Sequence, residues 1–380
     1  MYLIGLFFIV MSSEAQYFDE CKQVIPKVCS QGCMDNEGGY ICYCQEGYNL
    51  INHTYCRSIG PDPVVLFADR SYVSEYHPIT KKHRIIANNQ RNAVALDYDI
   101  KKMKVYWSDV YLNQIYRTNI NGSGVPEVVI TGAHTPDGIC VDWVFRNMYW
   151  TDTGTNVIEV ASLEDPSKRT TLISDNLDEP RAITIDPRIG YMFWSDWGQA
   201  AKIERAGMNG KQRLTLVDAD IYWPNGLTTD LVSKLLFWVD GLRHSLSSID
   251  YNGHGRSTIL QSSSILPHPF SITVFEDYVY WTDWQKKSII KANKFNGNHT
   301  ILVEHLYSPT GIQIYHPQKQ IDGINNHCEG HNGGCSDLCV AAPEVSDNSA
   351  KYSCLCPTNS SLLVDGRTCE GSEKNPLTPG

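Results

Sequence analysis

A four-residue signature, aromatic–Trp–x–Asp, recurs five times along the chain, and its regular spacing limits the fold more than any other feature. The copies stand at residues 106–109, 149–152, 193–196, 237–240 and 280–283. The steps between successive tryptophans are 43, 44, 44 and 43 residues. A period of about 40 to 45 residues is typical of β-propeller blades, which bury their faces only against neighbouring blades. The sequence therefore predicts an all-β propeller.

The same elements surround each signature. A proline turn and a short apolar run that ends in Asp precede it, as in Pro180 followed by residues 184–186. Another apolar run and an Asn-Gly pair follow it, as at Asn209. Because Asn-Gly is a strong signal for a tight hairpin, each repeat predicts four short antiparallel strands.

Two strands at opposite ends of the repeat array lack partners of their own. They lie at residues 64–69 and 311–315, and the second follows a proline. Pairing them completes one more blade and removes two exposed strand edges. We therefore expect a closed ring of six blades over residues 62–318, with Leu66 and Ile314 in the same blade.

Thirteen cysteines form two clusters of six, with Cys140 alone between them. Even numbers of cysteines in short, loop-rich segments indicate disulfide frameworks made in an oxidising compartment. A zinc site would need CxxC pairs or added histidines, and neither cluster contains CxxC. We expect Cys140 to be a small buried hydrophobe rather than a reactive thiol.

Composition and motifs favour a binding protein over an enzyme. The net charge of −10 argues against nucleic acid as a partner, because nucleic acids require basic stripes. The sequence contains no nucleophile elbow, metal-ligand cluster or phosphate loop. The signature aspartates occur once per blade, so we expect them to satisfy backbone and cross-blade hydrogen bonds rather than to form a catalytic carboxylate ring. We expect the signature tryptophans to be core residues.

Several features indicate the secretory route. An apolar run at residues 2–10 predicts a signal peptide over 1–15, although it lacks a basic n-region; the alternative is a truncated start that happens to be apolar. Sequons at Asn52, Asn121, Asn298 and Asn359 fit glycosylation. The polar tail at 371–380 contains no anchor, so the chain would be secreted if complete, and would lie on the outer side of the plasma membrane or endosome if part of a receptor.

The signature resembles the YWTD repeat of the low-density lipoprotein receptor family, whose propellers have six blades. Residues 237–260 and 268–283 resemble the lipoprotein, very-low-density-lipoprotein and yolk-protein receptors more than the Wnt co-receptors. The cysteine clusters resemble EGF-like modules at 17–57 and 324–370. The resemblance implies these disulfide bonds: Cys21–Cys33, Cys29–Cys42, Cys44–Cys56, Cys328–Cys339, Cys335–Cys354 and Cys356–Cys369.

The first module also resembles the calcium-binding subtype of EGF-like modules. The resemblance implies carboxylate ligands from Glu20 and Asp35, and backbone oxygens from Phe18, Asn36 and Gly39. Such hard oxygen ligands suit calcium. Tyr17 replaces the usual leading acid, which puts full calcium occupancy in doubt. The pattern around Asp35 also matches that for β-hydroxylation. The second module shows no calcium pattern.

The resemblance implies the region of a cargo receptor that supports ligand release in acidic endosomes and receptor recycling. Lipoproteins or other proteins would bind through cysteine-rich ligand repeats outside this sequence, and the propeller would contact those repeats at low pH. A propeller-folding chaperone of the endoplasmic reticulum is a further implied partner. His244 matches a histidine of the acid-closed contact, whereas Ile189 replaces another, which puts the full switch in doubt.

The alternative function is a stable ligand-binding propeller, as in matrix proteins, Wnt co-receptors or a secreted decoy. Trp223 is then a candidate aromatic anchor on one rim of the propeller. Its other interpretation is a packed loop residue.

Overall fold

The structure is a computed structural model that describes residues 19–23, 27–36, 38–346 and 349–371. The predicted signal peptide, Tyr17, Phe18 and residues 372–380 of the tail lie outside this part. The chain divides into two compact units, Met1–Arg57 and Ser58–Gly380. Among the described residues, no helix is both long and apolar enough to cross a membrane.

Six four-stranded antiparallel sheets form the blades of a propeller, as the repeat predicts. Blades 1 to 3 consist of β8 (Ala93–Asp99), β9 (Lys104–Asp109), β10 (Gln114–Asn119) and β11 (Glu127–Ile130); β12 (Pro136–Asp142), β13 (Asn147–Asp152), β14 (Val157–Ser162) and β15 (Arg169–Ile173); and β16 (Pro180–Asp186), β17 (Tyr191–Asp196), β18 (Lys202–Gly207) and β19 (Leu214–Val217). Blades 4 and 5 consist of β20 (Pro224–Asp230), β21 (Leu235–Asp240), β22 (Ser245–Asp250) and β23 (Ser257–Gln261); and β24 (Pro269–Phe275), β25 (Tyr278–Asp283), β26 (Ser288–Asn293) and β27 (His299–Val303).

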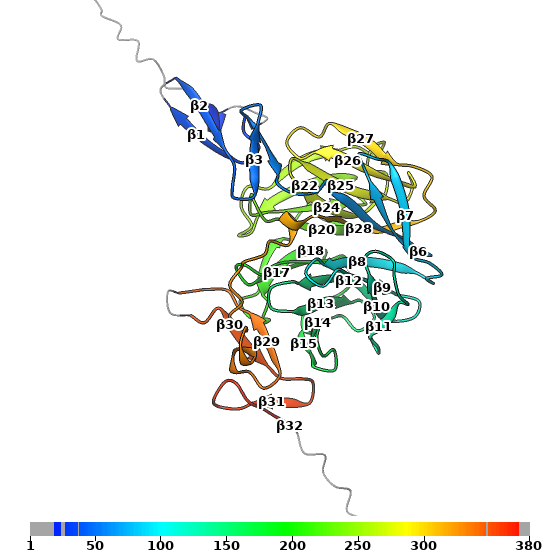
Figure 1. The fold of residues 1–380 in the computed structure, drawn as a ribbon, viewed down its shortest axis with the longest axis vertical. Coiled ribbons are helices and arrows are strands. Elements are labelled where there is room, and N and C mark those ends of the chain that lie inside the picture. Colours follow the sequence, from blue (N-terminus) through cyan, green and yellow to red (C-terminus); the bar gives the residue numbers. More distant parts are fainter. Residues whose placement is uncertain (1–18, 24–26, 37, 347–348, 372–380) are drawn as a thin grey trace, which may run out of the picture. The chain divides into compact units, whose positions relative to one another are not determined.

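The sixth blade joins the two ends of the array. Its strands are β28 (Pro309–Tyr315), β5 (Val64–Asp69), β6 (Tyr72–His77) and β7 (Lys82–Ala87), in this order. Strand β28 pairs with β5 in a register that places Ile314 opposite Val65 and Gln313 opposite Leu66, which confirms that Leu66 and Ile314 share a blade. Figure 1 shows β6 and β7, in blue to cyan, beside the yellow strands β26 and β27 of blade 5. The ring is therefore closed without a free inner edge.

The signature residues are structural. Their tryptophans, Trp107, Trp150, Trp194, Trp238 and Trp281, are at most 1% exposed, and they form the largest buried side chains of the blades. Each signature aspartate ends the second strand of its blade and accepts hydrogen bonds from loop N–H groups, as Asp109 does from Arg91 and Asn92. A different aspartate makes a hydrogen bond between blades: the Asp97 carboxylate of blade 1 accepts the Val141 N–H of blade 2 at 2.7 Å. Cys140 is buried and unpaired, and burial raises the pKa of its thiol.

Small paired strands and disulfide bonds form the EGF-like modules at both ends. The first contains α1 (Glu20–Gln23), β1 (Gly32–Asn36), β2 (Gly39–Tyr43), β3 (Tyr48–Ile51) and β4 (Tyr55–Ser58). The second contains η2 (His331–Gly334), β29 (Leu338–Ala341), β30 (Tyr352–Leu355), β31 (Ser360–Leu362) and β32 (Cys369–Gly371), and η1 (Pro317–Lys319) precedes it. The six disulfide bonds join the same cysteine pairs as the resemblance implies.

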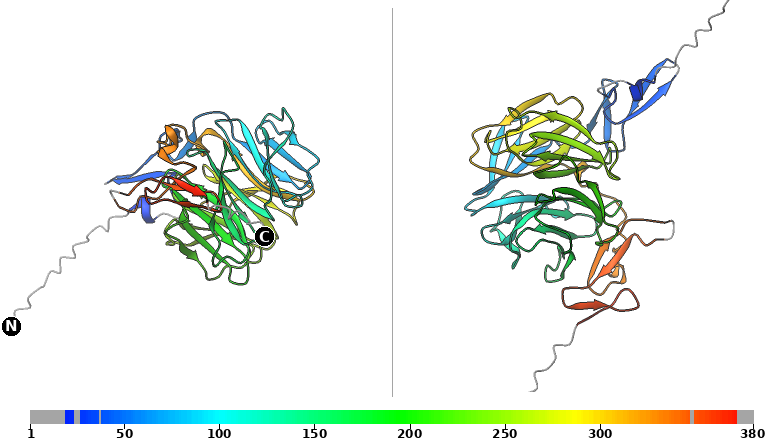
Figure 2. Two further views of the ribbon diagram at one scale, coloured as in Figure 1. Left: turned by 90° about the horizontal axis from the view of Figure 1, so that it is seen from below. Right: turned by 180° about the vertical axis from the view of Figure 1, so that it is seen from behind.

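Direct hydrogen bonds attach the second module to the propeller. The Asn147 side chain donates to the Cys339 carbonyl at 2.8 Å, and the Asn326 side chain donates to the Val144 carbonyl at 2.8 Å. Gly190 lies so close to the module that a Cβ there would meet the Ala342 carbonyl carbon at 2.5 Å. In both views of Figure 2, the orange and red strands of the module lie beside green propeller strands. The module and blades 2 and 3 therefore share one packed core.

Candidate functional site

One face of the propeller carries most of the residues that the sequence singled out. Each blade's second strand ends at this face in an aspartate, opposite the first residue of the inner strand. The signature provides this aspartate in five blades, as Asp196 opposite Pro180, and Asp69 provides it in the sixth, opposite Pro309. We call it the Asp face. The loops that flank the aspartates form its surface and hold Trp223 and His244. The other end of the blades, where the inner strands finish, is called the opposite face.

Asp240 fixes the two loops that carry these residues. The carboxylate is fully buried and accepts four backbone N–H groups. Two donors, Tyr222 at 2.8 Å and Trp223 at 3.2 Å, precede β20. The other two, Leu242 at 3.0 Å and Arg243 at 2.9 Å, follow β21. A single buried charge therefore determines the backbone positions of both loops.

Trp223, His244, His268 and Trp284 lie together on the Asp face, over blades 4 and 5, and we call them the aromatic–histidine patch. The His268 ring is stacked on Trp284, with centroids 5.2 Å apart, and is 6.2 Å from the Trp223 ring. Both tryptophans are more than one third exposed. Trp223 thus has a partly exposed indole that also lies near the His268 ring, so the anchor and the packed loop residue both stay predictions.

His244 is partly buried in the turn after β21, at a positive φ of 53°. Its Nδ1 lies 2.9 Å from the Leu266 carbonyl oxygen. A carbonyl can only accept, so this contact requires the proton on Nδ1. The hydrogen bond therefore fixes the tautomer and the orientation of the His244 ring.

His268 is harder to protonate than an exposed histidine. Burial lowers the pKa of its ring, and the positive charges of Arg181 and His244 lower it further, while Asp283 opposes them. The ring is therefore neutral at neutral pH and gains its charge only under acid conditions. The new charge would lie between two tryptophan rings, where a cation is stabilised.

Arg181 connects the patch to the centre of the Asp face. Its guanidinium lies 4.3 Å from the Trp197 ring centroid and donates to the Asn225 side chain at 2.8 Å. Its Nε is 3.7 Å from Asp137, and burial lowers the pKa of Arg181 while it raises that of Asp137. Asn225 in turn donates to the Pro269 carbonyl at 3.0 Å. These contacts span blades 2 to 5 and hold the face rigid around the patch.

A groove of about 410 Å³ lies next to Trp223. Its lining combines the aromatic side chains Trp197, Tyr222 and Trp223 with Leu242, Lys202 and Asp218. Such a recess, which combines aromatic side chains with polar and charged groups, is suited to a side chain of a protein ligand.

The structure adds three residues to the site and places Ile189 away from it. His268, Trp284 and Arg181 were not singled out, although the repeat register places His268 before Pro269 as Trp223 stands before Pro224. Ile189 lies in the loop after β16, at the opposite face, and lines a different cavity. Its departure from the family pattern therefore leaves the aromatic–histidine patch intact.

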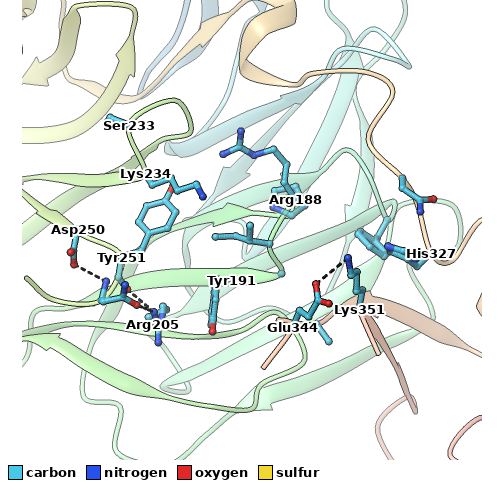
Figure 3. A pocket seen from close by; sticks show the side chains of 17 residues that line it. Arg188, Tyr191, Arg205, Ser233, Lys234, Asp250, Tyr251, His327, Glu344 and Lys351 are labelled. Carbon is cyan, nitrogen blue, oxygen red and sulfur yellow. Dashed lines mark hydrogen bonds and ion pairs between the residues drawn. The ribbon is translucent and has the colours of Figure 1, made fainter. Parts of the chain in front are cut away.

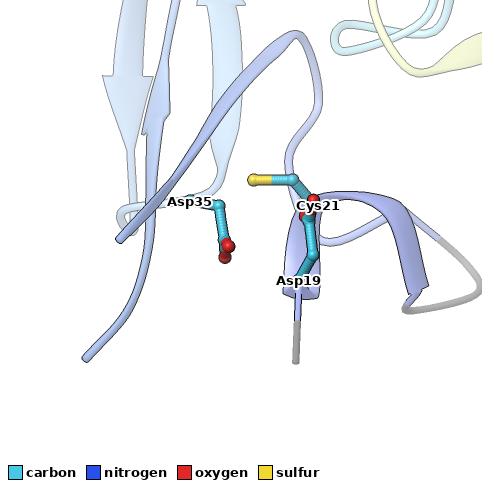
Figure 4. Close-up of side chains that lie close together, drawn as sticks. All are labelled: Asp19, Cys21 and Asp35. Carbon is cyan, nitrogen blue, oxygen red and sulfur yellow. The ribbon is translucent and has the colours of Figure 1, made fainter. Parts of the chain in front are cut away.

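The acidic cluster of the first module differs from the expected calcium ligands. The carboxylates of Asp19 and Asp35 lie together, within 4.8 Å, next to the sulfur of Cys21, which is bound in a disulfide (Figure 4). Glu20 is not in this cluster. Successive residues of a helical turn point in different directions, and Asp19, just before α1, is the one that faces Asp35. Asp19 also binds the Lys22 ammonium at 2.9 Å. Two adjacent carboxylates suit calcium, which would compete with Lys22 for Asp19.

The four sequons are accessible. Asn52, Asn121, Asn298 and Asn359 are all exposed, and Asn52 and Asn359 lie in turns with positive φ.

The fold and the signature define the chain as a YWTD-type β-propeller flanked by disulfide-bonded EGF-like modules. Comparison with known sequences agrees, because the profile of the low-density lipoprotein receptor repeat class B matches residues 146–187, 190–231, 234–276 and 277–316. Human low-density lipoprotein receptor-related protein 8 is 42% identical over 390 residues, which cover 90% of this chain and 40% of that protein. Mouse low-density lipoprotein receptor-related protein 5 is 42% identical over 328 residues, which cover 84% of this chain and 20% of that protein.

A solved structure of a nidogen/laminin complex contains a chain similar to this one. The TM-score is 0.62 at 28% sequence identity, over 66% of this chain and 98% of that chain. The chain thus contains the class B repeats of the low-density lipoprotein receptor family and has that family's propeller fold. It spans less than half the length of the curated relatives it matches.

Proposed function

We propose that this chain is the extracellular propeller region of an endocytic lipoprotein-type receptor, and that its aromatic–histidine patch strengthens a protein contact in acid. The partners are the cysteine-rich ligand repeats of the same receptor, which bind lipoproteins or other protein cargo. Contact between the repeats and the patch would compete with cargo and so promote its release and the recycling of the receptor. The role is binding, not catalysis.

The observation that carries this proposal is the pairing of two histidines beside two exposed tryptophans. His268 is neutral at neutral pH because burial lowers its pKa and Arg181 lowers it further, against the opposing charge of Asp283. Acid would add up to two positive charges to one small surface, which would attract an acidic face of the ligand repeats. The patch would then attract a surface that it ignores at neutral pH.

The size of the effect is limited. One histidine whose pKa differs by one unit between the free and bound states contributes about 1.4 kcal/mol. Two such histidines contribute about 2.7 kcal/mol, or roughly a hundredfold in affinity. A complete inversion of a two-state balance needs about 5.5 kcal/mol, so the patch alone biases the balance and does not fix it.

Surface plasmon resonance with immobilised, calcium-loaded ligand repeats of a lipoprotein receptor tests this function. We expect tighter binding at pH 5.5 than at pH 7.4, and a smaller ratio for His268→Ala. His305→Ala is the matched control, because His305 is an exposed histidine of blade 5 outside the patch. Equal affinities at the two pH values would refute the acid-dependent contact.

A second function is favoured by the groove beside Trp223 and by the similarity to the chain in the nidogen/laminin complex. In this function the Asp face binds a protein ligand at any pH, with Trp223 as an anchor. Binding that is pH-independent and lost in Trp223→Ala would support it over the first.

Calcium belongs to the proposed function of the first module. Asp19 and Asp35 would supply carboxylate oxygens to the ion, and bound calcium would stiffen the module. We also propose glycans at the four exposed sequons, on the extracellular route.

A further inference from the structure

A second cavity, of about 590 Å³, lies at the opposite face of the propeller, away from the aromatic–histidine patch. Four of its lining residues, Tyr191, Arg205, Lys234 and Tyr251, come from blades 3 and 4. Glu344 and Lys351 come from the second EGF-like module. Figure 3 shows these two groups on opposite sides of the cavity. We call it the module groove.

The propeller wall of the module groove is rigid in the absence of a ligand. The Arg205 guanidinium lies 4.3 Å from the centre of the Tyr191 ring and donates to the Tyr251 carbonyl at 2.7 Å and to the Asn252 side chain at 2.8 Å. The hydrogen bonds from Asn147 and Asn326 fix the module that forms the other wall. A preformed cavity of this volume has the size of typical ligand sites.

The charges along the module groove do not cancel. Lys351 is paired with Glu344 at 3.0 Å, and Arg188 is paired with the buried Asp186 at 2.7 Å. The guanidinium of Arg205 bonds only neutral oxygens, and its buried Nε has no partner. Lys234 is exposed, and no hydrogen bond or ion pair involves its ammonium in the described part of the chain.

Glu344 is already paired with Lys351, so Asp250 is the lining carboxylate that can oppose the charges of Lys234 and Arg205. It already accepts the N–H groups of Asn252 and His254, each at 2.8 Å. The groove thus has a local excess of positive charge in a chain whose net charge is −10. An anionic group would be attracted to Lys234 and Arg205.

Apolar groups complete the surface. Ile189 and the face of Tyr191 line the groove beside the cations. Tyr251 also lines the groove, although it is only 5% exposed, and its hydroxyl lies close to Thr229 inside the propeller.

We propose that the module groove binds an extended acidic peptide segment of a partner protein. A Glu or Asp carboxylate lies between Lys234 and Arg205, and the adjoining apolar side chain packs on Ile189 and Tyr191. The peptide is favoured over a compact anion because polar groups line both walls and can bond successive backbone amides. This binding is separate from the proposed acid-dependent contact, which uses the Asp face.

The test uses the whole chain labelled with ¹³C at its tyrosine rings. The probe is acetyl-Gly-Phe-Glu-Gly-amide, and two further probes are the same peptide with Gln for Glu and free 3-phenylpropionate. We expect saturable shifts of the Tyr191 and Tyr251 signals with the Glu peptide, and at least fivefold weaker binding of each other probe. Binding of 3-phenylpropionate as tight as that of the peptide would overturn the assignment to a peptide.

Lys234→Glu is the decisive variant. Reversal of one charge near a carboxylate should weaken the Glu peptide roughly tenfold. Lys81→Glu is the matched control, because Lys81 and Lys234 are both exposed, directly precede a strand and have φ values of 56° and 54°. Ser233→Trp, which changes an exposed lining residue, should block the groove without altering its charge. Unchanged affinity in both Lys234→Glu and Ser233→Trp, or tyrosine shifts confined to the Asp face, would overturn the proposal.

Discussion

Asp240 connects the stability of the propeller to the geometry of the candidate site, so we expect Asp240→Asn to affect both. The substitution keeps the shape of the side chain but removes its charge and one of its two acceptor oxygens. At least one of the four loop N–H groups then loses its partner and faces an amide donor instead. The other bonds become neutral, and neutral bonds are about half as strong.

The cost follows from these bonds. One unsatisfied N–H group costs about 1–3 kcal/mol, and the weaker bonds add a similar amount. With the lower values, the free energy of unfolding falls by about 2 kcal/mol, which lowers the melting temperature by roughly 4–8 °C for a domain of this size. Scanning calorimetry measures this decrease.

Asp152→Asn in blade 2 is the matched control. Asp152 is also buried and accepts four loop N–H groups, from His134, Thr135, Gly154 and Thr155. We expect a similar loss of stability from both substitutions. Only Asp240→Asn should change the acid response of His268, followed by NMR of its ring, because only Asp240 holds the Trp223 and His244 loops. An unchanged melting temperature in Asp240→Asn, or an equal change of the His268 titration in both variants, would refute this reasoning.

Three further predictions concern other charged groups. Lys294 and Asp230 form a buried ion pair at 2.7 Å. Lys294→Met alone should lower the free energy of unfolding in urea by about 3–5 kcal/mol, because it leaves the Asp230 charge buried without a partner, and the double variant with Asp230→Asn should recover most of this loss. Equal losses in the single and double variants would contradict the isolated buried charge as the cause. Burial lowers the pKa of His268 and of His316 below 6.5, so their neutral forms stabilise the fold above pH 6.5 and this contribution is lost as pH falls through the lowered pKa values. His268→Phe should therefore reduce the loss of stability between pH 7 and pH 5. An unchanged pH profile of stability would show that His268 does not contribute. Calorimetric titration should show calcium uptake by the chain that weakens in Asp35→Asn and Asp19→Asn; if Asp19→Asn binds normally while Glu20→Gln does not, the ligand set implied by the family pattern is the right one.

The ring of blades could be predicted from the sequence because each blade repeats the same local pattern. Five signatures at a fixed period predicted five blades. The two remaining strands, at 64–69 and 311–315, could pair with each other and so complete a sixth blade that closes the ring. Burial of the signature tryptophans and backbone bonding by the signature aspartates followed from their occurrence once in each blade. These are properties of a single repeat, which short-range patterns reveal.

The functional surface depended on contacts between repeats, which the period does not describe. His268 and Trp284 belong to the patch because of the ring stacking that joins blades 4 and 5. Arg181 acts across four blades, and nothing near it in sequence marks it. The module groove exists only because the second module packs against loops more than 100 residues earlier, such as the loop that contains Ile189. In the first module, Asp19 rather than Glu20 faces Asp35 because of the direction in which α1 begins.

The most direct test of the proposed function is the number of protons taken up when the chain binds the ligand repeats. The slope of the logarithm of affinity against pH gives this number, measured by surface plasmon resonance between pH 7.4 and pH 5.5 on calcium-saturated repeats. Two histidines whose pKa values each rise by about one unit on binding predict a maximal slope of about one in the wild-type chain, about half of that in His244→Ala or His268→Ala, and near zero in the double variant. A slope of zero in the wild-type chain, or a slope that survives in the double variant, would contradict the assignment of the acid response to the aromatic–histidine patch.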